Sequence, residues 1–129
     1  RIKSSYNWRT LYDMGIKLSM GTDSPVEDMD PIANLYSAVT RKSITNPDMP
    51  CWYGEEALNI KEAIELYTSG SAYASGEEKH MGLLEEGYLA DITVLDKDIY
   101  ADDTECLKTA QIAMTIVDGK IRYKQEWEQ

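Results

Sequence analysis

The spacing of apolar side chains changes from a helical to an alternating period near the start of the chain. Spacing of i, i+3 and i+4 predicts a short amphipathic helix that ends near Met14, and its apolar residues are Trp8, Leu11 and Tyr12. Gly15 can then adopt the left-handed conformation that stops a helix. Ile16, Leu18 and Met20 alternate with polar residues, which predicts a strand. Helix, tight turn and strand in this order are typical of a repeating α/β unit.

A second helix is predicted after Asp30, followed by a long loop. Asp30 is a capping residue and Pro31 suits the first helical turn, so we expect a helix that extends to Val39. The stretch 41–58 contains Pro and Gly and has little periodicity, which predicts a loop. Loops of this length inside compact domains are often functional.

A third helix is expected from the pattern of a capping box. Asn59 is followed three residues later by Glu62, and these two side chains can satisfy each other's backbone donors at a helix start. The predicted apolar face of this helix consists of Ile60, Ile64 and Tyr67. We expect Gly70 to end or interrupt the helix.

After residue 80 the pattern becomes that of strands. Alternating apolar residues predict strands around 90–94, 112–116 and 121–123. Asp118 and Gly119 separate the last two runs, and Asp-Gly between alternating runs is a strong signal for a hairpin. The prediction is therefore an α/β region over 1–80 and a β region over 81–129.

The alternation continues into a polar rim residue. If the strand parity persists, Ile16, Leu18 and Met20 face one way, while Gly21 and Asp23 face the other. Bulky residues on one face and small ones on the other suit a barrel strand that ends in a carboxylate at its catalytic rim. Two alternatives stay open for Asp23: a metal ligand and general base, or an Asx-turn residue.

Charge and composition narrow the function classes. The chain has 13 Lys and Arg against 23 Asp and Glu, a net charge of −10, which argues against nucleic acid and against an acidic membrane surface. The longest apolar run is three residues, so we expect no membrane span. Two cysteines predict no disulfide scaffold and favour reduced thiols in a cytoplasmic setting.

Other candidate chemical groups have simpler interpretations. Glu27 and Asp28 lack the spacing of a calcium-binding EF-hand loop and are expected to be solvated. His80 is the only histidine and is expected at the surface. Cys51 has no partner base in the pattern and is expected to be a small buried thiol. Ser24 lacks the Gly-x-Ser-x-Gly pattern of a nucleophile elbow.

Several motifs in a fixed order resemble the end of an amidohydrolase superfamily enzyme. They are residues 8–15 running into 20–26, Asp30-Pro31, 38–41, Glu62-Ala63, 67–74, 82–96 and 115–120. The ordered set is similar to the amidohydrolase 3 group, metal-dependent hydrolases that include relatives of N-acyl-D-amino-acid deacylase. The resemblance covers nearly the whole chain.

The resemblance implies a fold and a site. It implies the last β/α unit of a TIM-like barrel, with strand 16–23, plus the C-terminal strands of a small β-sandwich; an isolated chain would be mixed α+β. It implies that Asp23 binds a divalent metal, usually zinc, and takes a proton from the metal-bound water. The family's metal-binding histidines are missing, and a catalytic zinc needs about three protein ligands. We therefore expect a C-terminal piece that is inert alone.

Two functions are carried forward. The first is a part of a metal-dependent hydrolase of C–N bonds in a small amide-type substrate. The second is a non-enzymatic module that binds a partner through the loop 41–58, where Met49, Trp52 and Tyr53 supply contacts of the kind found at interfaces. A chain cut through a barrel would also expose unpaired strand edges, so we expect self-association.

Overall fold

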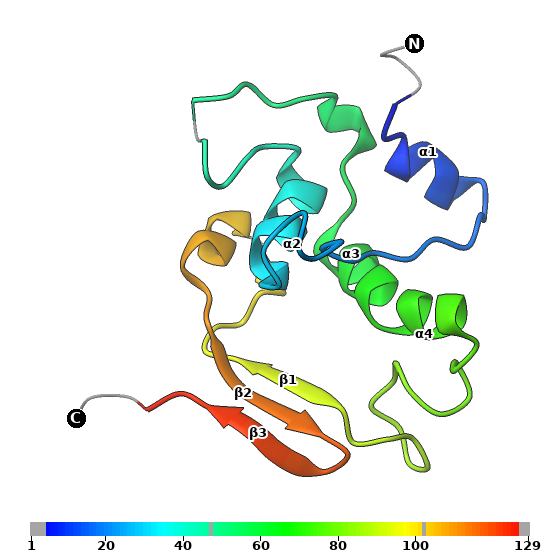
Figure 1. Cartoon of the computed structure of the whole chain (residues 1–129). Coiled ribbons are helices and arrows are strands. Elements are labelled where there is room, and N and C mark those ends of the chain that lie inside the picture. The colour runs from blue at the N-terminus through cyan, green and yellow to red at the C-terminus, as the bar shows by residue number, and fades with distance from the viewer. Residues whose placement is uncertain (1–4, 47, 102, 127–129) are drawn as a thin grey trace.

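The computed structural model describes residues 5–46, 48–101 and 103–126 and shows helices stacked over a small sheet (Figure 1). The helices are α1 (Trp8–Asp13), α2 (Pro31–Thr40), α3 (Ile60–Tyr67) and α4 (Ser69–Ser75). The strands are β1 (Ile92–Leu95), β2 (Ile112–Val117) and β3 (Lys120–Lys124). Two short 3-10 helices complete it, η2 (Gly54–Glu56) and η3 (Thr104–Thr109). The chain is therefore a small mixed α+β structure.

The predicted helix starts are confirmed because the capping side chains act locally. The Asp30 carboxylate accepts the backbone N–H of Ile32 at 2.9 Å, and Pro31 opens α2. At α3 the Asn59 side chain accepts the N–H of Glu62 at 3.0 Å, while the Glu62 carboxylate accepts the N–H of Asn59 at 2.7 Å. Both arrangements satisfy donors that the first helical turn leaves without intrahelical partners.

The chain after α3 breaks at Thr68 and not at Gly70. Thr68 has φ −107° and ψ −89°, outside the helical region, and α4 starts at the next residue. Gly70 lies inside α4, where a Cβ would come within 2.6 Å of the Leu18 carbonyl oxygen. The glycine is therefore explained by the close approach of another backbone segment, and the expected helix end was misplaced by two residues.

The three strands form one antiparallel sheet in the order β1-β2-β3. The Asp118-Gly119 hairpin is confirmed, with positive φ at both residues (51° and 69°) as a two-residue type I′ turn requires. Thr93, Thr115 and Tyr123 are cross-strand neighbours, as are Val94, Met114 and Lys124. These two rows alternate along β2 and therefore face opposite sides of the sheet.

The strand predicted for 16–20 is wrong for this structure. The segment is irregular and belongs to no sheet among the described residues. The Met20 N–H donates to the Leu66 carbonyl at 3.0 Å, and the Ser71 hydroxyl donates to the Met20 carbonyl at 2.9 Å. The strands at 92–124 pair only with one another, so the segment's backbone binds the helices instead. The barrel strand is thus not formed in this structure, whereas the mixed α+β alternative is confirmed.

One hydrophobic cluster joins the helices to η3. Its buried residues are Ile32, Leu35, Tyr36, Ala38, Leu58, Ala63, Leu66, Ile99, Leu107 and Ala110. The cluster contains residues from both regions expected from the sequence, 1–80 and 81–129. The division of the chain into these two regions stays a prediction. Within the described ranges, no helix has the length and apolarity that crossing a membrane would require.

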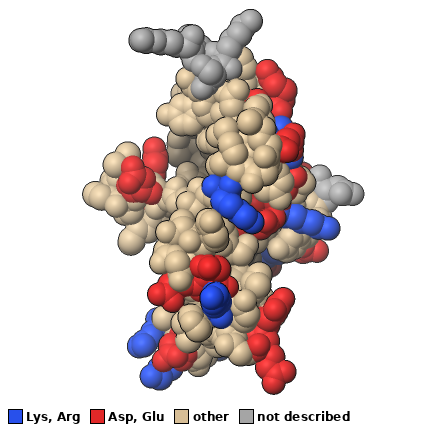
Figure 2. All heavy atoms as spheres, turned by 90° about the vertical axis from the view of Figure 1, so that its right-hand side faces the viewer, with Lys and Arg blue, Asp and Glu red and all other residues tan. Residues whose placement is uncertain are grey.

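Basic side chains lie among acidic ones on the face shown in Figure 2 and do not form a continuous patch there. Two pairs of opposite charges in the structure are Lys108–Glu105, at 2.5 Å, and Arg9–Asp13, at 3.2 Å.

Candidate functional site

Asp23 lies in an exposed turn between the irregular segment and α2. Its φ is +54°, and its carbonyl oxygen accepts the N–H of Val26 at 2.8 Å. The turn is held to α2 where the Asn34 side-chain amide donates to the Gly21 carbonyl at 3.4 Å. The Asp23 side chain is solvent-exposed and makes no hydrogen bond with other residues that the structure describes. Asp23 thus lies in a turn that its backbone carbonyl closes, whereas an Asx-turn would need its side chain as the acceptor. The role of Asp23 as a metal ligand stays a prediction.

The residues present do not form a metal site by themselves. Within 5–46, 48–101 and 103–126, no group of three or more His, Cys, Asp and Glu side chains lies close enough to hold an ion. His80 is exposed, as expected. A zinc site needs about three protein ligands, so a site that includes Asp23 would require ligands that this arrangement does not supply.

The acidic residues after Asp23 serve the turn and the helix cap. Asp28 accepts the N–H of Asp30 at 3.2 Å, and Asp30 in turn caps α2. Glu27 and Asp28 are exposed, which agrees with the expected solvated loop.

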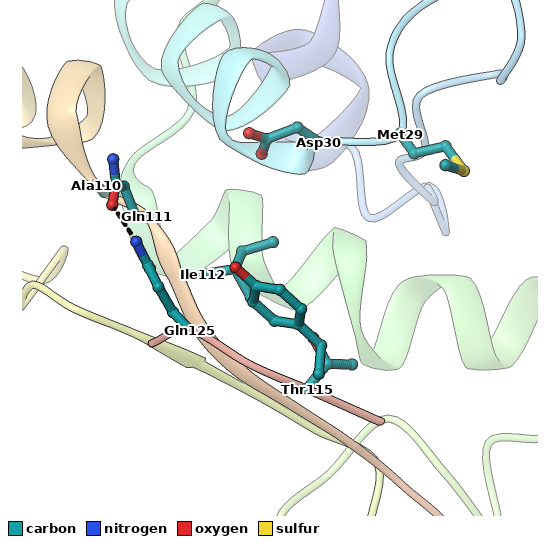
Figure 3. A pocket seen from close by; sticks show the side chains of 8 residues that line it. Met29, Asp30, Ala110, Gln111, Ile112, Thr115 and Gln125 are labelled. Atoms are coloured by element: carbon teal, nitrogen blue, oxygen red, sulfur yellow. Dashed lines mark hydrogen bonds between the residues drawn. The ribbon is translucent and has the colours of Figure 1, made fainter. Parts of the chain in front are cut away.

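An open depression of about 540 Å³ lies between Asp30 and the sheet (Figure 3). Thr115 and Tyr123 of the sheet line it together with Met29 and Asp30, so this side of the sheet is the one that faces the helices. At one end the Gln125 side-chain amide donates to the Gln111 carbonyl oxygen at 2.8 Å. Only non-local packing brings these residues together, so sequence reasoning did not find this depression.

A larger apolar cleft of about 730 Å³ lies between the helices and β1. Ile64 and Tyr67 of α3 line it together with Leu83 and Leu95. The Tyr67 hydroxyl is buried, and burial raises the pKa of Tyr67. Sequence reasoning did not find this cleft, because its walls come from segments far apart in the chain.

The loop 41–58 is anchored by Arg41, which sequence reasoning missed. Arg41 is 6% exposed and its guanidinium lies over the rings of Trp8 and Trp52. Its Nε donates to the Trp52 carbonyl at 3.0 Å, and the Trp52 N–H donates to the Arg41 carbonyl at 2.9 Å. Desolvation by burial lowers the pKa of Arg41. Cys51 is exposed, so its expected burial was wrong.

A second arginine connects α1 to α3. Arg9 forms a two-pronged interaction with the Glu62 carboxylate, with Nη1 donating to Oε1 at 2.9 Å and Nη2 donating to Oε2. Arg9 Nε also donates to the Ala57 carbonyl at 3.2 Å. The hydrogen bonds from Arg9 are the largest cause that holds the pKa of Glu62 below its ordinary value. The Arg9–Glu62 pair therefore holds α1 against α3, and we assign it a structural role.

Comparison with known proteins decides the family. Residues 1–123 match the sequence pattern of the amidohydrolase family. The chain belongs to the amidohydrolase family. The resemblance inferred from the ordered motifs is thereby confirmed, although the local structure around Asp23 would not have established it.

The relatives of this amidohydrolase chain are much longer than the chain itself. YtcJ of Bacillus subtilis, named as an amidohydrolase, is 41% identical over 96% of this chain and 23% of its own length. An N-substituted formamide deformylase of Arthrobacter pascens is 32% identical over 90% of this chain and 21% of its own. The chain therefore spans about a fifth of these relatives.

A solved structure gives the same result. An uncharacterised metal-dependent hydrolase from Pyrococcus horikoshii superposes with a TM-score of 0.65 and 34% identity, over 78% of this chain and 20% of that one. The mixed α+β arrangement thus corresponds to one part of a larger hydrolase fold.

Proposed function

We propose that this chain is the C-terminal part of a metal-dependent hydrolase that cleaves C–N bonds in a small amide-type substrate. The observation that carries the proposal is the family match over 1–123. The similarity to an N-substituted formamide deformylase and to a metal-dependent hydrolase supports both the bond type and the need for a metal. N-substituted formamides are the substrate class with which to begin.

Within that function we assign Asp23 as a metal ligand and general base in the longer enzyme, with zinc as the metal. Its carboxylate is exposed and free of hydrogen bonds to other described residues, so it is available to a ligand set supplied elsewhere. Alone, the 129-residue chain should be inert, because its described residues form no metal site. A cytoplasmic location stays a prediction from composition.

The test is carried out on the complete reading frame that contains this sequence. The purified protein is assayed for bound metal by elemental analysis and for hydrolysis of N-substituted formamides and N-acyl amines. Asp23→Ala should reduce the rate at least about 100-fold and lower the metal content. Asp28→Ala, a nearby exposed carboxylate, is the matched control and should retain both. Unchanged activity in Asp23→Ala would refute the assignment of this residue.

A second candidate function is a binding module that uses the loop 41–58. The specific observation is the exposure of apolar side chains there, 53% for Met49 and 38% for Trp52. The test substitutes Met49→Ser and Trp52→Ser in the complete protein. If hydrolysis of C–N bonds is retained in these variants, the binding role of the loop is separate from catalysis. Loss of activity without loss of structure would instead place the loop in the hydrolase site.

A further inference from the structure

Arg41 is a buried cation without a carboxylate partner. Only 6% of the Arg41 surface is exposed to solvent. Arg41 is the C-cap of α2 and has the left-handed backbone conformation, with φ +57°. Among the residues that the structure describes, no carboxylate forms an ion pair with it. Its Nη2 atom is buried and has no hydrogen-bond partner among these described residues. A buried charged donor without an acceptor is unfavourable, so such a group in a native structure needs an explanation.

Two indole rings lie against the guanidinium. Its Cζ lies 4.2 Å from the ring centroid of Trp8 and 5.1 Å from that of Trp52. Tyr6 stands edge-on to both indoles, with ring centroids 6.1 and 5.5 Å apart. Cation–π attraction stabilises the charge, but ring faces do not accept the in-plane N–H bonds of the Nη2 group.

Two acidic groups act on Arg41 through space. Glu56 raises the pKa of Arg41 through space, and Glu55 does so more weakly. The Glu56 carboxylate, however, accepts the Thr10 hydroxyl at 2.5 Å and the Thr10 N–H at 2.9 Å. These residues make the surroundings of Arg41 less positive without satisfying its N–H groups.

We propose that Arg41, Trp8 and Trp52 form a binding site for a small free carboxylate. A carboxylate can accept the N–H groups of Nη2 in the plane of the guanidinium. Tyr6, which packs edge-on against both indoles, is 65% exposed.

The site is independent of the hydrolase assignment. The turn that contains Asp23 contacts α2 at Asn34, whereas Arg41 is the C-cap that follows the last residue of the same helix. Failure of one proposal therefore leaves the other untouched.

The test is a titration of the 129-residue chain with acetate at constant ionic strength, followed by tryptophan fluorescence because Trp8 and Trp52 contact the guanidinium. We expect a saturable change with acetate. Acetamide, its neutral isostere, should give none, because it carries no charge for the guanidinium to pair with. A linear response to acetate, or an equal response to acetamide, would overturn the proposal.

Variants locate the site. Arg41→Gln should abolish the acetate response, and Arg41→Lys should weaken binding at least about tenfold because the planar fork is lost. Lys42→Gln removes the adjacent exposed cation and should bind like the original chain. Acetate binding that Arg41→Gln retains, or that Lys42→Gln loses to the same extent, contradicts the site. If circular dichroism shows that Arg41→Gln is unfolded, Arg41→Lys and the comparison with acetamide decide.

Discussion

At the residue scale, Glu62 combines two stabilising roles. Its carboxylate closes the capping box with Asn59 and also accepts the Arg9 guanidinium. The pair with Arg9 needs the ionised form, and its hydrogen bonds are the largest cause that holds the pKa of Glu62 below its ordinary value of 4.5. A group with a lowered folded-state pKa contributes stability above its unfolded pKa, and that contribution disappears as the pH falls through the folded value.

We therefore predict that Glu62→Gln, which keeps an acceptor for the cap, destabilises the chain by about 1 kcal/mol at neutral pH, from the loss of a partly exposed charge pair. The drop in stability between about pH 5 and about pH 3 should also become shallower. Urea unfolding at several pH values measures both effects. Glu86→Gln, at an exposed position, is the control and should leave the pH profile as it was. An identical acid profile in Glu62→Gln would contradict this role.

Gly70 gives a second prediction at the residue scale. A methyl group there would meet the Leu18 carbonyl at 2.6 Å, and backbone cannot move aside as a flexible side chain can. Gly70→Ala should destabilise by about 1 to 3 kcal/mol, although alanine is the better helix former. Gly21→Ala is the control, since nothing lies within 4 Å of its added carbon. A thermal melt in which Gly70→Ala is as stable as Gly21→Ala would show that the segment 16–20 does not pack as described.

At the element scale, the predictable features are those that neighbouring residues determine. The Asp30 cap, the Asn59–Glu62 box and the Asp118-Gly119 turn each depend on a few consecutive residues, and the sequence predicted all three. The strand predicted for 16–20 is absent from the structure. A strand needs a neighbouring strand to pair with, and the pattern of one segment does not show whether such a neighbour exists.

The candidate sites follow the same division. Asp23 was found from its motif, which is local. The environment of Arg41 was missed because it depends on the approach of Trp8 and Trp52 from distant parts of the chain. The apolar cleft was missed for the same reason, since α3, α4 and β1 line it together.

The sheet has an apolar outer face. Thr115 and Tyr123 face the helices, so Val94, Met114 and Ile116 lie on the opposite side, and the register places Ile121 opposite Ile116. None of these four belongs to the core cluster, and Ile121 is 59% exposed. A sheet that is apolar on both faces is typical of a sandwich, in which a second sheet packs about 10 Å away. This face supports the expected β-sandwich.

At the scale of the whole molecule, the exposed sheet face leads us to predict self-association of the 129-residue chain. Sedimentation velocity should show dimers or larger species whose fraction rises with concentration. Added salt should increase association, because it screens the repulsion between copies that each carry a net charge of −10. A monomer at every concentration would contradict the prediction.

Substitutions on the two faces of β3 test where association occurs. Ile121→Lys places a charge on the outer face and should shift the equilibrium towards monomer. Tyr123→Lys changes the same strand on the side of the helices and should leave association unchanged. Equal effects of the two would show that the outer face is not the contact.

The burial of Leu107 against α2 affects how this sequence can be recombined with its relatives. Leu107 is 1% exposed and Tyr36 is 2% exposed, and both belong to the cluster that connects the start of the chain to η3. A chimaera with its crossover near residue 80 would pair side chains inherited from two parents within one interior. Crossovers before Pro31 and after Ala110 keep that interior from a single parent and should yield the more soluble hybrids.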